Sequence, residues 1–149
     1  MSLPSSLLQR GDVVIAAFPF TDLSATKRRP ALVLAATTLD VILAFISSVL
    51  PATFKSNEIP LIPTDTDFIQ TGLKVPSILR LDKLATIDKQ LITRRIGKLS
   101  KERLQAVDDR LIQVLGIDLK RFQQADRRLL AEVMHTQGIE ALRQLLQYN

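Results

Sequence analysis

The stretch from Gly11 to Leu34 constrains the fold of this 149-residue chain more than any other part. An apolar run over Val13–Phe18 is rich in β-branched residues, which suit the pleated surface of a sheet. Pro19 follows it, and proline cannot donate a hydrogen bond to a neighbouring strand. A second apolar run covers Ala31–Ala35. The stretch therefore predicts two strands joined by a loop.

The predicted loop combines turn-forming and cationic side chains. Its first part holds residues whose side chains hydrogen-bond to nearby backbone, namely Thr21, Asp22 and Ser24. Its last part holds three consecutive cations before Pro30, namely Lys27, Arg28 and Arg29. A loop that brings two arginines to the edge of a small sheet can hold a phosphate group, because the guanidinium fork matches phosphate oxygens. The alternative for Arg29 is a surface arginine paired with Asp22.

Further short strands follow, and together they predict a small antiparallel barrel. The expected strands are Val41–Ile46, Glu58–Pro63 at a sheet edge, Ser77–Leu81 and Gln90–Leu99. Leu84–Asp88 is expected to be a short connection. Ser100 is expected to cap a helix that Gly116 ends. The chain lacks both a β–α–β alternation and a glycine-rich phosphate loop, which argues against a nucleotide-binding sheet.

The spacing of apolar residues divides the chain into two parts. Residues 1–117 are expected to form the barrel with its terminal helix. Residues 118–149 are rich in helix formers and predict two amphipathic helices broken at Gly138. We expect this helical extension to pack on the body, because its apolar stripe needs a partner.

Composition excludes several kinds of chemistry. Cysteine is absent and there is one histidine, His135, so thiolate catalysis and a histidine-based metal centre are excluded within one chain. We therefore expect no cofactor. The net charge of +5 favours anionic partners such as nucleic acid. We find neither a secretory leader nor a membrane-spanning run, and we expect a cytoplasmic protein.

Three ordered blocks between Arg10 and Ile117 resemble the MazF/PemK-type toxins, the ribonuclease halves of bacterial toxin–antitoxin pairs. The first block contains GDVV, FPFTD and RRPALVL, within residues 11–34. The second is Asp40–Ser48, where the family has an apolar strand ending in a Thr–Ser pair. The third runs from Gly72 to Asp82 and continues through residues 86–89 and 94–100.

This resemblance implies an SH3-like antiparallel β-barrel that forms a homodimer with an RNA groove. It implies a sequence-selective, metal-independent endoribonuclease that cleaves single-stranded RNA. It also implies a cognate antitoxin protein with an acidic tail, and operator DNA as a further partner of the toxin–antitoxin complex.

The resemblance also assigns site residues. Arg29 stands where the family has a catalytic arginine before proline. Ser47 stands where it has a catalytic threonine, and the serine lacks the methyl group that restricts rotation about χ1. Arg80 and Asp82 match an Arg-x-Asp pair of some members, and period two places them on one face of a strand. Their alternative role is a surface ion pair that contributes little to the stability of the fold.

Other cations and hydroxyls are expected to contact RNA without reading its sequence. We expect Lys27, Arg28 and Arg94 to bind the backbone and Ser48 to support Ser47. The chain departs from the family at Ala25-Thr26, where many members carry Glu-Gln. It also lacks the histidine that some members carry in that loop, since His135 lies outside the matched region and is expected on a helix surface.

Two alternatives to catalysis stay open. The same barrel without activity would be a nucleic-acid- or protein-binding module, because Ser47 replaces threonine and the loop acid is missing. An antitoxin-dependent, DNA-binding autorepressor is the other alternative. Cleavage of RNA separates both from a ribonuclease.

Overall fold

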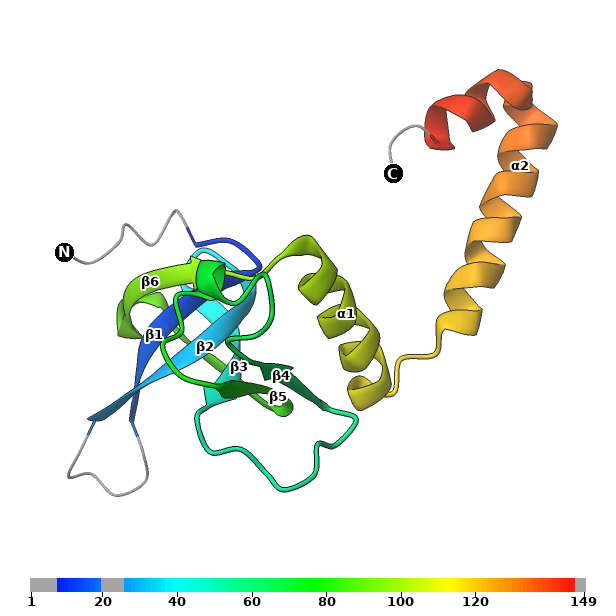
Figure 1. Ribbon diagram of the computed structural model, residues 1–149. Helices are drawn as coiled ribbons and strands as arrows, with labels where there is room; N and C mark the ends of the chain where they lie inside the picture. Colours follow the sequence, from blue (N-terminus) through cyan, green and yellow to red (C-terminus); the bar gives the residue numbers. More distant parts are fainter. Residues whose placement is uncertain (1–7, 20–25, 147–149) are drawn as a thin grey trace. The chain divides into compact units, whose positions relative to one another are not determined.

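The computed structural model describes residues 8–19 and 26–146 of the chain (Figure 1). The chain divides into two compact units, Met1–Leu115 and Gly116–Asn149. The turn predicted at Thr21, Asp22 and Ser24 lies outside the described residues.

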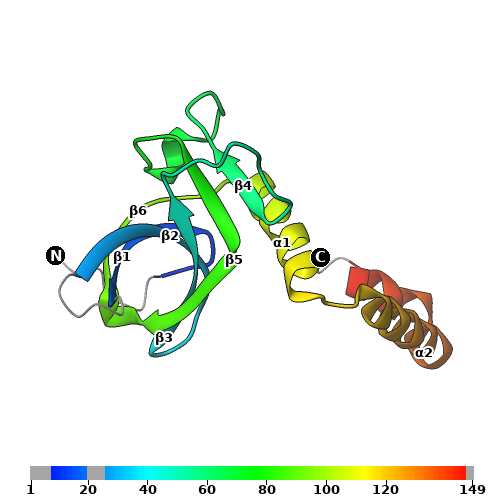
Figure 2. The ribbon, with the colours of Figure 1, turned by 90° about the horizontal axis from the view of Figure 1, so that it is seen from below.

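The first unit is built on a six-stranded antiparallel sheet with the order β4-β5-β3-β2-β1-β6. Figure 2 shows that the sheet curves round into a barrel. Its strands are β1 (Asp12–Pro19), β2 (Thr26–Ala36), β3 (Asp40–Ser47), β4 (Glu58–Leu61), β5 (Ser77–Asp88) and β6 (Ile92–Lys98). Two 3₁₀ turns, η2 (Ile69–Thr71) and η3 (Lys89–Leu91), precede β5 and β6. The mainly-β, antiparallel barrel expected from the sequence is confirmed, with β4 at the sheet edge as predicted.

The three cations before Pro30 lie inside β2, so the prediction of a loop over them is wrong. Lys27, Arg28 and Arg29 pair with Phe18, Ala17 and Ala16 of β1. The strand pairing extends to the end of β1, and the cations stay exposed, so the sheet contains them without burying charge.

The prediction of a connection over Leu84–Asp88 is also wrong, because these residues belong to β5. β3 pairs with both halves of β5: Ala44 pairs with Leu84, whereas the next residue, Phe45, pairs with Arg80. The intervening residues 81–83 form a bulge. The long apolar β3 therefore supplies partners for a second strand segment that looks too short by itself.

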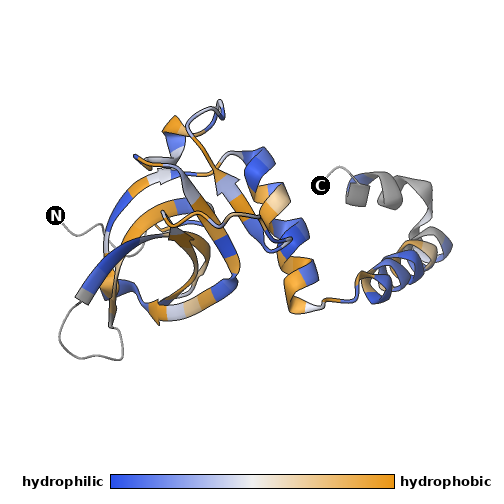
Figure 3. Cartoon of the chain, turned by 60° about the horizontal axis from the view of Figure 1, so that its bottom comes forward, coloured by the Kyte–Doolittle hydropathy of each residue, from blue (hydrophilic) through white to orange (hydrophobic). Residues whose placement is uncertain are grey.

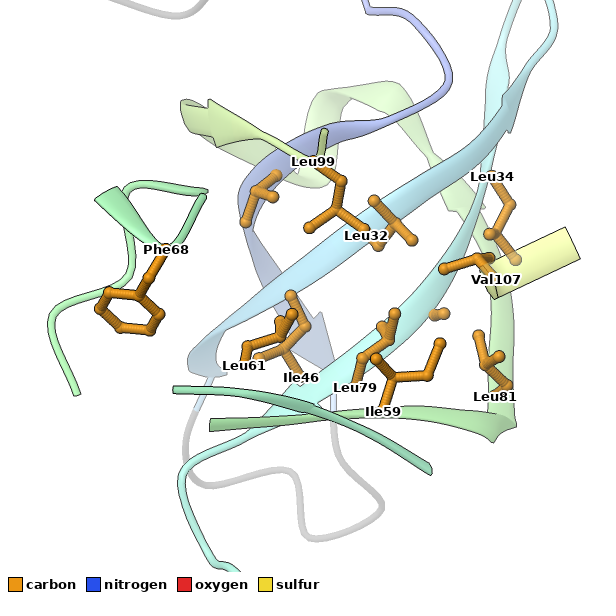
Figure 4. Close-up of a cluster of buried hydrophobic side chains, with 12 residues drawn as sticks. Leu32, Leu34, Ile46, Ile59, Leu61, Phe68, Leu79, Leu81, Leu99 and Val107 are labelled. Carbon is orange, nitrogen blue, oxygen red and sulfur yellow. The ribbon is translucent and has the colours of Figure 1, made fainter. Parts of the chain in front are cut away.

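The core of this unit consists of two apolar clusters. The first lies between the sheet and helix α1 (Lys101–Leu115), and Val107 joins it from the helix (Figure 4). The second contains Val14, Ala16, Ala31 and Leu43 and includes Phe18, whose ring centroid lies 4.4 Å from that of Phe45. Figure 3 shows long apolar stretches along the strands. The neighbouring residues Leu32 and Val33 belong to different clusters and are both buried, so both faces of the sheet bury apolar side chains.

Helix α1 begins and ends as the sequence predicts. The Ser100 hydroxyl accepts a hydrogen bond from the backbone N–H of Arg103 at 3.2 Å, which is an N-cap. Gly116 follows the helix with φ of 65°, in the left-handed region that favours glycine.

The second unit contains helix α2 (Leu119–Leu146), which is broken at Gly138 as predicted (φ 78°, ψ −177°). His135 is exposed on this helix, as expected. No helix in the described part of the chain is both long enough and apolar enough to span a membrane.

Candidate nucleic-acid interface

A cavity of about 760 Å³ opens where β2 and β3 approach the segment before β5 and the strand β6. Its lining includes five cations: Arg28, Arg29, Lys74, Arg94 and Arg95. Three serines also line it, namely Ser47, Ser48 and Ser77. No carboxylate occurs among the described residues that line the cavity. Such a surface attracts anions, and its hydroxyls can hydrogen-bond phosphate oxygens or ribose.

Strand register places Arg29 and Ser47 on the same face of the sheet. Ala31 pairs with Phe45 across β2 and β3. Arg29 precedes Ala31 by two residues, and Ser47 follows Phe45 by two, so both side chains keep the face of that pair. The structure therefore brings these two predicted catalytic residues to one end of adjacent strands, at the same cavity.

The hydroxyl of Ser47 is held by the backbone that follows it. Its Oγ accepts a hydrogen bond from the N–H of Val49 at 3.1 Å. The contact compensates in part for the missing methyl group, because it restricts rotation of the serine side chain.

A close crossing of two backbone segments builds the opposite wall of the cavity. A Cβ at Gly97 of β6 would lie 2.3 Å from the carbonyl oxygen of Gln70, and a Cβ at Gly72 would lie 2.0 Å from that of Ile96. The two glycines therefore allow β6 to touch the turn η2. This contact brings the segment before β5 to β6, and Lys74 and Arg94 both line the cavity.

Arg103 of helix α1 holds the segment from Pro60 to Asp67, which precedes η2, by hydrogen bonds. Its guanidinium donates hydrogen bonds to the Asp67 carboxylate at 3.0 Å, to the Pro60 carbonyl at 2.8 Å and to the Asp65 carboxylate. Its hydrogen bond is the largest influence on the pKa of Asp67 and lowers it; burial opposes this shift, and the Ser100 hydroxyl reinforces it. The clamp fixes residues 65–67 a few positions before Gly72.

Arg80 and Asp82 lie on one face of β5, as their spacing predicts. The Arg80 guanidinium donates to the Asp82 carboxylate at 3.0 Å. Neither residue is among the described residues that line the cavity. Arg80 nevertheless pairs with Phe45, so its side chain shares the face that carries Ser47. Asp82 lies in the bulge of β5, a feature that can redirect a side chain.

Burial is the largest single influence on the pKa of Asp82, and it raises this pKa. The hydrogen bond and the positive charge of Arg80 lower it, hydrogen bonds from the backbone and from Asn57 lower it further, and the net result lies below the ordinary value of 3.8. Asp82 is thus an ionised carboxylate at neutral pH that Arg80 and Asn57 hold by hydrogen bonds.

The predicted RNA contacts divide between two places. Arg28, Ser48 and Arg94 line the cavity, whereas Lys27 is exposed at its pairing with Phe18 and is not among the lining residues. Sequence reasoning missed Lys74, Ser77 and Arg95 as lining residues. Arg95 was detectable as the neighbour of Arg94, but no signal local to Lys74 or Ser77 indicates a site.

The residues that the structure describes contain no cluster of three or more histidine, aspartate and glutamate side chains able to hold a metal ion.

The fold and the cavity define a small antiparallel barrel with an anion-attracting end. Residues 9–115 match the model of the PemK-like, MazF-like toxins of type II toxin–antitoxin systems. The chain belongs to this family.

Solved structures of similar fold extend the comparison. The Mycobacterium tuberculosis toxin MazF-mt6 is 23% identical, with a TM-score of 0.56 over 72% of this chain and 98% of that one. MazF in a MazE–MazF crystal structure from Deinococcus radiodurans is 18% identical, with a TM-score of 0.60 over 75% and 98% of the two chains.

A mycobacterial endoribonuclease in complex with its cognate antitoxin is 17% identical, with a TM-score of 0.56 over 74% of this chain and 97% of that one. A search of curated proteins found no match. At these identities the solved structures establish a shared fold.

Proposed function

We propose that this chain is the toxin of a toxin–antitoxin pair and an endoribonuclease that cleaves single-stranded RNA. Family membership supports the first part, and the naming of mycobacterial structures of this fold as endoribonucleases supports the second. The cavity with five cations and no carboxylate in its described lining carries the proposal, because phosphate binding needs such a surface.

The proposed reaction is metal-independent and uses the RNA's own 2′-hydroxyl. The 2′ oxygen attacks the adjacent phosphorus, and the bond from phosphorus to the 5′ oxygen breaks. The 2′-hydroxyl loses its proton and the leaving 5′ oxygen gains one. The products are a 2′,3′-cyclic phosphate and a free 5′-hydroxyl.

Arg29 and Ser47 are the proposed phosphate-binding catalytic residues. The planar guanidinium of Arg29 can hold two phosphate oxygens and stabilise the charge that builds up on them. The Ser47 hydroxyl can donate to a third oxygen. Their common cavity and common face support this assignment.

Arg80 and Asp82 are proposed to act beside them, on the side of Ser47 that faces β5. Asp82 would accept the proton of the 2′-hydroxyl, and Arg80 would bind the phosphate and hold Asp82. The lowered pKa of Asp82 supports a carboxylate that is ionised at neutral pH, as a proton acceptor must be. Lys27, Arg28, Ser48 and Arg94 would bind the RNA backbone.

The partners follow from the family. We propose a cognate antitoxin, since the mycobacterial endoribonuclease and the Deinococcus MazF occur in complexes with one. We also propose a homodimer, selectivity for an RNA sequence, contact with operator DNA through the antitoxin complex, and action in the cytoplasm. Residues 118–149 are proposed to pack on the body through the apolar side of α2.

The test is cleavage of a long single-stranded RNA in EDTA by the wild type, Arg29→Ala, Asp82→Ala and, as a matched surface control, Lys101→Ala. We expect cleavage by the wild type and the control, with a loss of about 100-fold or more for Arg29→Ala. Mass analysis of the products should find cyclic phosphate ends. A wild type that binds RNA without cleaving it would replace this proposal with the binding module.

A further inference from the structure

Helix α2 carries a cationic stripe that lies outside the part of the chain matched by the family. Lys120, Arg121, Arg127 and Arg128 are all exposed. At about 100° per residue these four positions fall within a sector of about 120° around the helix axis. The seven-residue repeat separates the two pairs by about 10.5 Å along the axis. The four charges thus form one continuous surface.

One exposed carboxylate, that of Glu132, lies beside this stripe. None of the ion pairs between residues of the described segments involves any of the four cations. A shallow hollow on the helix surface lies between Arg121 and Arg128 and is lined also by Gln124, Ala125 and Leu129, with Glu132 as its one acidic side chain. Two arginines flanking a hollow over a small residue leave room for a phosphate between them.

We propose that the cationic stripe of α2 binds the sugar–phosphate backbone of single-stranded RNA, without reading its sequence. This inference rests on the proposed function, which supplies the RNA. The stripe would add backbone contacts beyond the cleavage site, and it would raise affinity mainly through release of counterions.

An anionic membrane is the main competing surface, because basic amphipathic helices also bind lipid. The opposite side of α2 argues against it. Phe122 and Leu129 are exposed there, but Asp126 lies between them on the same side of the helix. Inserting that carboxylate among lipid chains would be costly, and it would be repelled by anionic headgroups.

The test measures binding by the full chain of a fluorescent single-stranded 20-mer whose riboses are all 2′-O-methylated, so that cleavage through the 2′-hydroxyl is blocked. Dissociation constants are measured by anisotropy over a series of KCl concentrations. The test variant changes Lys120, Arg121, Arg127 and Arg128 to Gln, which keeps helix propensity. The control removes the same total charge from exposed lysines outside the proposed site: Lys55, Lys83, Lys98 and Lys101 to Gln.

We expect the slope of log Kd against log salt to fall by about 2 to 3 in the α2 variant, since each phosphate contact to a single strand contributes about 0.7. The Kd near 0.1 M salt should rise by about tenfold or more, and the control should change both values much less. Equal slopes for the two variants would overturn the proposal. Binding to phosphatidylglycerol vesicles is measured alongside, and an α2 variant that no longer binds the vesicles but binds RNA as the wild type does would also overturn it.

The same data separate this inference from the proposed function. A wild type that leaves unmodified RNA intact, with a slope that still depends on α2, would refute the ribonuclease and keep the binding surface. If the wild type cleaves RNA and the α2 variant has the same salt slope as the wild type, the ribonuclease is kept and the binding surface is refuted.

Discussion

Glu58 and Arg80 face each other as a direct pair across β4 and β5, with 3.9 Å between the Arg80 Nε and the Glu58 Oε1 atoms. The Glu58 side chain is 5% exposed, and one of its oxygens accepts the backbone N–H of Lys55 at 2.9 Å. Arg80 therefore lies between a buried carboxylate and the more exposed Asp82. The Nε of Arg80 is buried without a hydrogen bond of its own.

We predict that Glu58→Gln weakens the hold on Arg80 while keeping the shape of the side chain. The free energy of unfolding, measured in urea, should fall by about 1 kcal/mol, because Arg80 keeps Asp82 as a partner. A double-mutant cycle with Arg80→Met isolates the pair. A coupling energy of zero in that cycle would show that the two side chains do not interact in solution.

A second prediction concerns the pH dependence of cleavage. Because the pKa of Asp82 lies below 3.8 in the folded chain, its protonation should not limit kcat/KM above about pH 5. Arg80→Met removes the two largest influences that lower this pKa, whereas burial, which raises it, remains, so the acid limb of the profile should move to higher pH. An acid limb at the same pH in both proteins would rule out Asp82 as the group that accepts the proton.

Acid stability should depend on the Arg103 clamp. The folded-state pKa of Asp67 is lowered from 3.8, so the unfolded chain binds the proton first. The stabilising effect of Asp67 is thus present at neutral pH and is lost as pH falls below about 4. Arg103→Met should lower the unfolding free energy at pH 7 by about 1 to 2 kcal/mol and flatten its decline in acid.

Urea unfolding at pH 7 and pH 3 measures both effects of the Arg103 change. Lys101→Met, on the same turn of α1 but exposed, is the matched control and should behave as the wild type. An Arg103 variant with the same decline as the wild type would place the acid sensitivity elsewhere.

The crossing of Gly72 and Gly97 provides a steric prediction. Gly97→Ala should destabilise the barrel by about 3 kcal/mol or more and weaken RNA binding, because its Cβ would meet backbone atoms of Gln70 and Thr71. Gly116→Ala is the control: its Cβ has no neighbour within 4 Å, so only the strain of φ at 65° applies, about 1 kcal/mol. Similar thermal midpoints for the two variants would contradict the crossing.

The sequence predicted those elements whose signals are local. Runs such as Val13–Phe18, the cap at Ser100 and the break at Gly138 depend on neighbouring residues alone, and each was found. The family resemblance found Arg29 and Ser47, which share the cavity.

Errors arose where a distant partner decides the structure. The cations before Pro30 were predicted to lie in a loop because the apolar run begins only at Ala31, but pairing with β1 extends β2 through them. Leu84–Asp88 became strand because β3 offers partners beyond the bulge. Lys74 lines the cavity because η2 contacts β6, and no local sequence pattern predicts that contact.

The placement of the arginines within β2 has a further consequence. The backbone of Arg28 and Arg29 is already ordered by its pairing with β1, so it loses little freedom when an anion binds. Since neighbouring strand residues point to opposite faces, the side chains of these two arginines leave β2 on opposite faces of the sheet, and both line the same cavity. Insertions in the connection between β1 and β2 would leave the positions of both arginines unchanged, because these positions are set by the pairing with β1 and not by the length of the connection. The positions of Arg28 and Arg29 are therefore independent of the length of that connection.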